Sequence, residues 1–120
     1  MGIKKMDIEK ILKEINFDNL VPVIIQDKNS LRVLMLGYMN KEAFIKTLET
    51  KKVHFYSRSR KKLWLKGETS GNFLNVENIF LDCDSDTLLI IATQQGNATC
   101  HTGRVSCFFR KLEDEWKTIE

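Results

Sequence analysis

A segment in the last third of the chain contains most of the side chains that could bind a metal ion. Residues 81–110, LDCDSDTLLIIATQQGNATCHTGRVSCFFR, include all three cysteines, a group of closely spaced aspartates and one of the two histidines. The cysteines are Cys83, Cys100 and Cys107, and the aspartates are Asp82, Asp84 and Asp86. Thiolates suit zinc, whereas a group of carboxylates suits a hard ion such as magnesium. The segment therefore predicts two metal sites of different chemistry beside each other.

The number of cysteines matches a catalytic zinc site. A structural zinc ion normally has four protein ligands, whereas a catalytic zinc ion has three and keeps a position open for water or substrate. The spacing, however, is not the short C-x-x-C pattern of most structural zinc modules, so the pattern by itself does not identify a zinc site. A second interpretation stays open, because free cysteines such as Cys83 and Cys107 are often small buried apolar residues in strands.

The aspartate cluster constrains how two metals could share one site. In a continuous strand, side chains alternate between faces, so the three aspartates would lie on one face and Cys83 on the other. Both metals could then meet only if the segment bends or if the thiolate site is completed from elsewhere, for example by another subunit. An EF-hand is excluded, because the Gly and Glu that its loop requires are Thr87 and Thr93 here. The other interpretation is an acidic turn that faces water.

The two histidines are candidates for proton transfer. His101 follows Cys100 and could be a fourth zinc ligand, a general acid or base, or a loop residue without a special task. Histidine side chains titrate near neutral pH, which suits proton transfer. His54 lies in the alternating stretch VHFYSR, where a hydrogen-bonded structural histidine is the competing interpretation.

A basic run and the loop after it are candidates for phosphate binding. The run contains Arg58, Arg60 and Lys62, and taken alone it is also typical of a solvated turn. The loop GETSGN at residues 67–72 adds the hydroxyl groups of Thr69 and Ser70, which could bind phosphate oxygens together with backbone N–H groups. The combination favours a phosphate site. The substrate-binding candidates are Arg58, Arg60, Lys62, Thr69, Ser70 and, from the cysteine segment, Arg104.

Length and composition indicate a single soluble domain over residues 1–120. Of the 120 residues, 42% are hydrophobic and 29% are charged, and the net charge of +3 is too small to indicate a nucleic-acid partner by itself. No segment approaches the roughly 20 apolar residues that span a bilayer. The start of the chain, MGIKKMDIEK, lacks the apolar core of a signal peptide. We therefore expect a cytoplasmic protein with reduced thiols and no membrane partner.

The apolar pattern predicts an α+β fold with two short helices and a mixed or antiparallel sheet. Helices are expected at residues 7–16, with Asp7 as the N-cap, and at residues 41–50, with Asn40 as the N-cap. Strands are expected at residues 21–26, 32–38, 53–58, 63–65, 73–82, 87–94 and 105–112. The last residues, DEWKTIE, are expected to form a solvated end.

Several segments resemble, in order, the signatures of the phosphoribosyl-AMP cyclohydrolase family. They are LVPVIIQD, VLMLGYMN, KKVHFYSRSRKKLW, KGETSGN, LDCDSD and ATCHTGRVSCFFR, and they cover residues 20–110. The resemblance implies hydrolytic opening of the adenine ring of phosphoribosyl-AMP between nitrogen 1 and carbon 6, which gives ProFAR in histidine biosynthesis. It also implies zinc at Cys83, Cys100 and Cys107, and magnesium at Asp82, Asp84 and Asp86.

The resemblance has consequences for assembly and mechanism. Family members are dimers with zinc ligands from both subunits, which implies an intertwined homodimer and would resolve the opposite-face conflict at Cys83. The family often continues into a second, pyrophosphohydrolase domain, so this shorter chain is expected to be monofunctional. A zinc-activated water would attack the ring with magnesium assisting. We expect His101, with His54 second, to move the proton, while the basic run and residues 67–72 hold the phosphates.

Two other classes of function fit parts of the pattern. A zinc-stabilised nucleic-acid-binding module is suggested by Phe55, Tyr56 and Trp64, which are interleaved with the basic run. A passive metal-binding protein would turn over no nucleotide. Chelation separates the first from an enzyme, because removal of a structural zinc ion unfolds a small domain.

Overall fold

The structure is a computed structural model that describes residues 5–120. It has two helices, α1 (Lys5–Lys13) and α2 (Lys41–Thr50). Its strands are β1 (Val21–Asp27), β2 (Val33–Met39), β3 (His54–Ser57), β4 (Lys62–Leu65), β5 (Phe73–Leu81), β6 (Leu88–Gln95), β7 (Arg110–Leu112) and β8 (Trp116–Thr118). The expected α+β class is confirmed. No helix within the described range is both long enough and apolar enough to cross a membrane. The interpretation of MGIKKMDIEK depends in part on residues 1–4, which lie outside the described residues.

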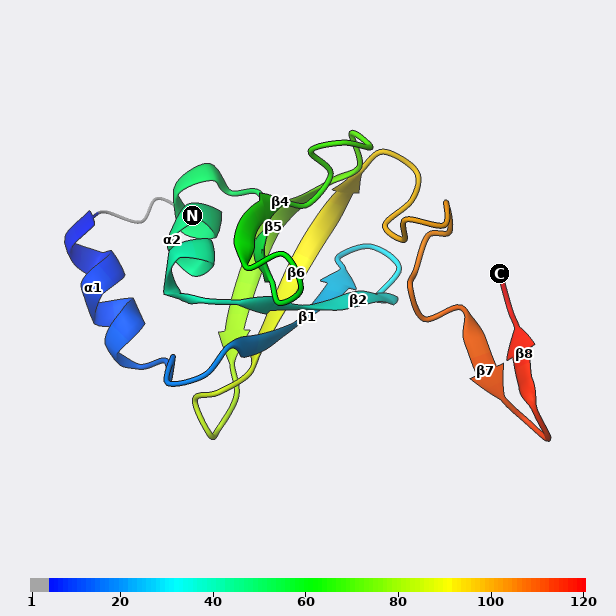
Figure 1. Cartoon of the computed structure of the whole chain (residues 1–120), viewed down its shortest axis with the longest axis horizontal. Helices are drawn as coiled ribbons and strands as arrows, with labels where there is room; N and C mark the ends of the chain where they lie inside the picture. Colours follow the sequence, from blue (N-terminus) through cyan, green and yellow to red (C-terminus); the bar gives the residue numbers. More distant parts are fainter. Residues whose placement is uncertain (1–4) are drawn as a thin grey trace.

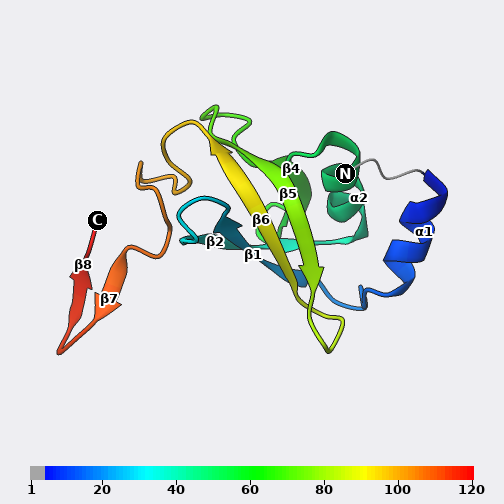
Figure 2. The same ribbon diagram turned by 180° about the vertical axis from the view of Figure 1, so that it is seen from behind.

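A mixed sheet in the order β2-β1-β6-β5 forms the centre of the molecule (Figure 1). β1 pairs antiparallel with β2 and parallel with β6, and β6 pairs antiparallel with β5. A parallel pair needs a long crossover connection. The intervening chain supplies it and contains α2 and the β3–β4 hairpin, which lie on the same side of the sheet (Figure 2). The predicted mixed sheet is therefore confirmed.

Strict alternation along β1 creates one fully buried face of the sheet. Val23 and Ile25 of β1 are fully buried, and so is Ile90 of β6. They share a core cluster with Phe44 of α2 and Phe55 of β3. This core fixes the β3–β4 hairpin against the sheet, and the hairpin carries the basic run at its turn.

The approach of β3 to β2 depends on a glycine. A Cβ atom at Gly37 would lie 2.5 Å from Cε1 of Phe55, which is far inside van der Waals contact. Phe55 is 1% exposed and therefore has little room to move away. The absence of a side chain at Gly37 thus allows the hairpin to pack directly on the sheet.

The opposite face of the sheet is also apolar but lies partly open. Ile24 pairs with Leu36 and Leu89, and Leu89 pairs with Phe80, so these side chains share this face. Leu36 is 41% exposed and Phe80 is 55% exposed. Strands in a parallel pair are normally covered on both faces. An open apolar face at this place is typical of a surface that another chain covers.

The ends of the helices agree only in part with the predictions. Asn40 is confirmed as the N-cap of α2, because its side chain accepts a hydrogen bond from the N–H of Ala43 at 2.8 Å. Asp7 is not the N-cap of α1. The helix begins at Lys5, which places Asp7 in the first turn, where a carboxylate favours the positive end of the helix dipole. α1 also ends three residues earlier than expected, at Lys13, because the N–H groups of Glu14 and Ile15 donate to carbonyls three residues back and not four.

The strand predicted at residues 105–112 is wrong for its first five residues. Only Arg110–Leu112 form β7, which pairs with β8. The preceding N–H groups bind elsewhere: that of Cys107 donates to the Leu34 carbonyl at 2.7 Å, and that of Phe108 donates to Ser106 Oγ at 2.9 Å. These bonds leave no regular ladder for a strand at this position.

The C-terminal segment is more than a solvated end. Its residues are exposed as expected, but Trp116–Thr118 form β8 and complete a hairpin with β7. Figure 1 shows this hairpin at the opposite end of the molecule from α1. The apolar side chains of Leu112 and Trp116 are 59% and 64% exposed, so the hairpin presents apolar surface outward.

Candidate metal and substrate sites

The three aspartates converge in a tight turn between β5 and β6. One carboxylate oxygen from each of Asp82, Asp84 and Asp86 lies within 4.8 Å of the others. Asp82 Oδ1 builds the turn by accepting hydrogen bonds from the N–H groups of Asp86 at 3.0 Å and Thr87 at 3.2 Å. The segment bends between β5 and β6, which is one of the two possibilities that the sequence left open, and no continuous strand crosses residues 82–86. The bend, not the strand period, brings the carboxylates together.

The chemistry of this turn fits a hard cation. Desolvation acts to raise the pKa of Asp82, but the hydrogen bonds from Asp86 and Thr87 outweigh it and hold the pKa below its usual value. Asp82 is therefore ionised at neutral pH. Three oxygen donors that are exposed and close together suit magnesium, which binds a few carboxylates and retains water ligands.

Cys100 and Cys107 lie together beyond the other end of β6. Cys100 is 6% exposed, and its Sγ lies 3.0 Å from Thr102 Oγ1. Its N–H donates to the Arg104 carbonyl at 3.0 Å, which closes a tight loop. Cys107 is exposed as a residue, but its thiol is partly buried beside Cys100, and each thiol shifts the pKa of the other. This irregular segment, residues 100–109, is called the cysteine loop below, and it presents a pair of candidate sulfur ligands.

The two thiols differ in acidity. Burial raises the pKa of Cys107 to about 11, and the charge and hydrogen bond of Cys100 act in the same direction. Burial also acts to raise the pKa of Cys100, but hydrogen bonds from Thr102 and Cys107 and the charge of Arg104 bring it below its usual value. Cys100 therefore loses its proton more readily, whereas Cys107 keeps its thiol proton at neutral pH. A soft metal ion that replaces this proton would find two thiolate ligands already adjacent.

Cys83 lies at the opposite end of β6 from this pair. It is an exposed residue of the aspartate turn, which precedes β6, whereas Cys100 follows the strand (Figure 2). A strand of this length, Leu88–Gln95, spans about 23 Å at about 3.3 Å per residue. A single chain therefore brings two of the three predicted zinc ligands together and leaves the third apart.

A cavity of about 360 Å³ brings candidate substrate and proton-transfer residues to the cysteine loop. Its lining includes Arg60 from the β3–β4 turn, Thr69 and Ser70 from the loop 67–72, and Cys100 with His101. These residues come from three separate parts of the sequence. Their convergence gives one hollow with a cation, hydroxyl groups, an imidazole and a thiol.

A second, more open groove of about 650 Å³ adjoins this cavity between β2 and the β3–β4 hairpin. Arg58, Tyr38 and Tyr56 line it, and Arg60 and Trp64 line both hollows. The guanidinium carbon of Arg58 lies 4.0 Å from the centre of the Tyr38 ring, a distance typical of a cation–π contact. The predicted basic run thus divides between two neighbouring hollows.

Two other predicted substrate residues line neither hollow. Lys62 is exposed at the start of β4. The Nε of Arg104 lies 3.4 Å from the backbone oxygen of Glu120, and its guanidinium group stacks 4.1 Å from the centre of the Phe109 ring. In one chain, Arg104 therefore belongs to the contact between the cysteine loop and the C-terminal segment.

His54 also lies outside the cavity that contains His101. Its ring Nδ1 lies 2.9 Å from the Lys52 carbonyl, and its backbone N–H donates to Thr47 Oγ1 at 3.0 Å. These bonds join the end of α2 to the start of β3. The arrangement supports a structural task for His54 and leaves His101 as the histidine at the site.

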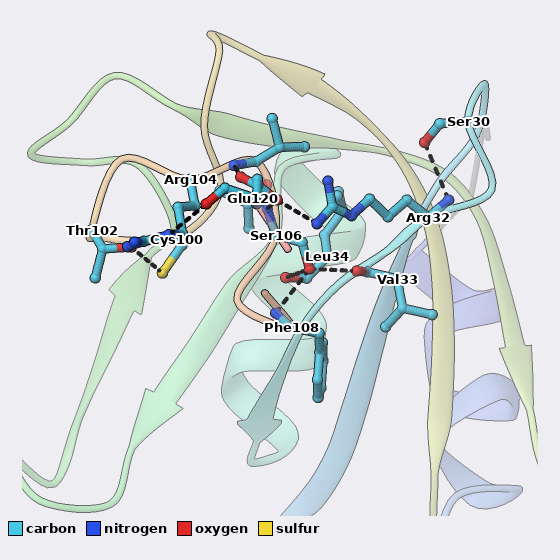
Figure 3. Close-up of polar contacts among 12 residues, drawn as sticks. Ser30, Arg32, Val33, Leu34, Cys100, Thr102, Arg104, Ser106, Phe108 and Glu120 are labelled. Carbon is cyan, nitrogen blue, oxygen red and sulfur yellow. Dashed lines mark hydrogen bonds and ion pairs between the residues drawn. The ribbon is translucent and has the colours of Figure 1, made fainter. Parts of the chain in front are cut away.

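A polar network that sequence reasoning missed holds the cysteine loop against β2 (Figure 3). The buried Ser106 donates from Oγ to the Val33 carbonyl at 2.7 Å. The carboxylate of Glu120 accepts hydrogen bonds from the N–H groups of Val105 and Ser106 and forms an ion pair with Arg32. No motif in the sequence indicated these contacts, because the partners are far apart along the chain.

Lys66 was also missed. It lines the same cavity as Cys100, and burial lowers its pKa while the two thiols act in the opposite direction. The available signal was its place directly before Gly67 in the segment KGETSGN.

The model of the phosphoribosyl-AMP cyclohydrolase family matches residues 35–109, well over half of the chain. The chain belongs to this family. A phosphoribosyl-AMP cyclohydrolase from Clostridium botulinum (strain Alaska E43 / Type E3) is 56% identical over 110 residues, which cover 89% of this chain and 100% of that relative. The family match over residues 35–109 spans both hollows, the aspartate turn and all three cysteines of this chain.

Longer curated relatives carry the cyclohydrolase sequence as one part of a larger protein. The histidine biosynthesis bifunctional protein HisIE from Thermoanaerobacter pseudethanolicus is 55% identical over 107 residues, which cover 88% of this chain and 49% of that protein. The protein of the same name from Haemophilus influenzae is 56% identical over 108 residues, with 90% and 46% coverage. The chain thus spans about half the length of these bifunctional relatives.

Proposed function

We propose that this chain catalyses the hydrolytic opening of the adenine ring of phosphoribosyl-AMP between nitrogen 1 and carbon 6, with ProFAR as the product, in histidine biosynthesis. Family membership supports the reaction class. The observation that carries the proposal is the cavity in which Cys100 and His101 meet Arg60, Thr69 and Ser70. A phosphorylated nucleotide needs cationic and hydroxyl groups at one end and proton-transfer chemistry at the other, and this cavity contains both.

We assign zinc to the cysteines and magnesium to the aspartate turn. The sulfur pair suits a soft ion and the oxygen cluster a hard one, as their donor atoms require. Zinc, when bound, supplies a water molecule whose pKa is lowered toward about 7. Metal binding by thiols needs them reduced, so the cytoplasm is the location that we propose.

The chain's own residues would then orient the substrate and move a proton. Arg60, with Thr69 and Ser70, binds phosphate oxygens and fixes the nucleotide in the cavity, which lowers the entropic cost of reaching the reactive geometry. The imidazole of His101 lies on the cavity wall next to Cys100 and transfers the proton between water and the ring nitrogen that leaves. Arg58, in the neighbouring groove, is placed to bind a second phosphate.

We propose a homodimer as the active form, because one chain supplies an incomplete zinc site. Cys83 lies about one strand length from Cys100 and Cys107, so Cys83 of the partner subunit would complete the set. The open apolar face at Leu36 and Phe80 and the exposed apolar side chains of the β7–β8 hairpin provide surface for a second copy. Sharing would also bring the aspartate turn of one subunit to the cavity of the other.

The direct test is turnover by the purified protein. Phosphoribosyl-AMP is incubated with enzyme, zinc and magnesium, and the absorbance change on ring opening is followed. We expect turnover that a chelator abolishes and that zinc with magnesium restores. Cys100→Ser should lose zinc and activity together. No turnover by folded, metal-loaded wild-type protein would overturn the proposal.

A further inference from the structure

Lys66 has a position that the proposed reaction leaves unexplained. It follows β4, where its backbone N–H donates to the Val53 carbonyl at 3.0 Å and fixes its place at the core. Its Nζ donates to the carbonyl of Thr99 at 2.5 Å. Thr99 is 1% exposed and directly precedes Cys100. A side chain from the hairpin therefore holds the backbone immediately before a metal ligand.

The part of the chain that the structure describes places no carboxylate within ion-pair distance of Lys66. Among residues 5–120, the carboxylate ion pairs involve other cations, namely Lys28, Arg32, Lys46 and Lys117. Lys66 lines the same cavity as Thr99 and Cys100, and the charges of Cys107 and Cys100 act on its half-buried ammonium. A half-buried ammonium is stable only when nearby groups compensate its charge, so the thiolates and Lys66 stabilise each other.

We propose that Lys66 is a positioning residue of the cysteine metal site: it holds the Thr99 carbonyl and balances the negative charge of the thiolates around the metal ion. The proposal rests on the metal assignment made above. Three thiolates carry one negative charge more than a divalent ion neutralises, and the site is partly shielded from water. A nearby ammonium removes that excess at low cost, because the hydrogen bond to Thr99 already fixes it in place.

The two parts of this role can be separated by three substitutions at one position. Lys66→Gln retains a donor for the Thr99 carbonyl but loses the charge. Lys66→Arg retains the charge, and Lys66→Met retains only the chain length. Lys46→Met is the matched control, because Lys46 is a half-exposed lysine of α2 that forms a surface ion pair with Glu49 at 3.8 Å.

The readout is metal affinity and ligand geometry in the full-length dimer, measured without substrate. Zinc affinity is obtained by competition with a chromophoric chelator, and Co²⁺ replaces zinc to report thiolate ligation through its sulfur charge-transfer absorbance. We expect Lys66→Gln and Lys66→Met to bind zinc roughly tenfold more weakly or worse. Lys66→Arg should stay within about threefold of wild type, and Lys46→Met should be unchanged.

Each outcome decides between the alternatives. Wild-type affinity in Lys66→Gln would overturn charge balance and leave only the hydrogen bond. Wild-type affinity in Lys66→Met would overturn both parts. If Lys66→Met fails to fold, the Gln and Arg variants still decide. Failure of the metal assignment is recognisable separately, because wild-type protein would then show no sulfur charge-transfer absorbance with Co²⁺, and the proposal for Lys66 would fail with it.

Discussion

At the scale of single residues, the aspartates of the β5–β6 turn divide their tasks. Asp82 is both a candidate ligand and the acceptor that closes the turn. Asp84 shares the oxygen cluster but accepts no hydrogen bond among those described in the turn. Asp84 therefore tests ligation without a change in the backbone, whereas a change at Asp82 would alter both.

Asp84→Asn should weaken magnesium binding at the aspartate turn and leave zinc binding unchanged. A neutral amide is a poorer ligand than a carboxylate for a hard dication, so half-maximal activity should need roughly tenfold more magnesium. Magnesium titration of turnover and metal analysis of the purified variant provide the measurement. Loss of zinc, with no recovery at raised magnesium, would contradict the assignment of ligands. Asp114→Asn, in the exposed β7–β8 turn, is the control.

Asp27 illustrates a pH effect outside the site. Its Oδ2 accepts hydrogen bonds from the N–H of Ser30 at 2.7 Å, Ser30 Oγ at 2.9 Å and the N–H of Asn29 at 3.1 Å. The backbone hydrogen bond from Ser30, helped by the other two bonds and opposed by burial, lowers the pKa of Asp27 below its usual 3.8. The lowered value means that the carboxylate stabilises the fold above pH 3.8 and loses this effect as the pH falls through its folded-state pKa.

Asp27→Ala should therefore lower the free energy of unfolding by about 1 kcal/mol at neutral pH, through loss of the turn hydrogen bonds. The difference from wild type should shrink below pH 3.8 as the native carboxylate is protonated. Urea unfolding of both proteins at neutral and acidic pH measures it. An equal difference at both pH values would show that the charge of Asp27 contributes nothing.

At the scale of elements, the cysteine loop is held from outside. It has no regular secondary structure between Cys100 and Phe109, and its order depends on β2 and on the C-terminal segment. β2 supplies the carbonyls of Val33 and Leu34, and Glu120 supplies a carboxylate (Figure 3). The β7–β8 hairpin brings this carboxylate back to the loop. The hairpin therefore returns the end of the chain to the segment that contains the candidate metal ligands Cys100 and Cys107.

Glu120→Gln should loosen this loop without unfolding the sheet. The substitution removes the ion pair with Arg32 and weakens the acceptor for the N–H groups of Val105 and Ser106. Hydrogen exchange at these two amides should become about tenfold faster, while the amides of β1 and β6 stay protected. Glu115→Gln, an exposed change on the same hairpin, should leave both amides unchanged. Equal exchange in wild type and Glu120→Gln would remove Glu120 from the network.

At the scale of the whole molecule, the candidate zinc ligands and the apolar surfaces both favour the proposed homodimer. The thiolate pair and Cys83 lie at opposite ends of β6, and the sheet leaves one apolar face open. A two-fold pair of chains could bring the aspartate turn of each subunit to the cavity of the other and cover this face. Two active sites per dimer would follow, each built from both chains.

Mixing two inactive variants tests this arrangement. Cys83→Ser and Cys107→Ser proteins damage the same shared site from different chains, so each mixed dimer has one site with both changes and one intact site. With random exchange, half of the dimers are mixed, and activity should reach roughly a quarter of wild type if the sites are independent. Exchange is verified by differently tagged subunits. Confirmed mixed dimers without activity would contradict sharing between independent sites.

Local patterns in the sequence determined the elements and the ligand types. Alternation and apolar periodicity located α2, β1 and the β5–β6 pair to within one or two residues, because burial of one face dictates those patterns. Residue chemistry likewise separated the candidate sulfur ligands from the candidate oxygen ligands before any geometry was known. The motifs 81–86 and 98–110 also indicated the family that the comparison confirmed.

The tertiary structure alone decided how these residues meet. The bend at residues 82–87, the irregular course of residues 105–109 and the end of α1 result from hydrogen bonds to particular partners, which periodicity does not encode. The contacts of Lys66 with Thr99 and of Glu120 with Ser106 join residues distant in sequence. Such contacts depend on how the hairpins pack on the sheet. For the same reason, only the length of β6 shows that Cys83 lies apart from the other two cysteines of its own chain.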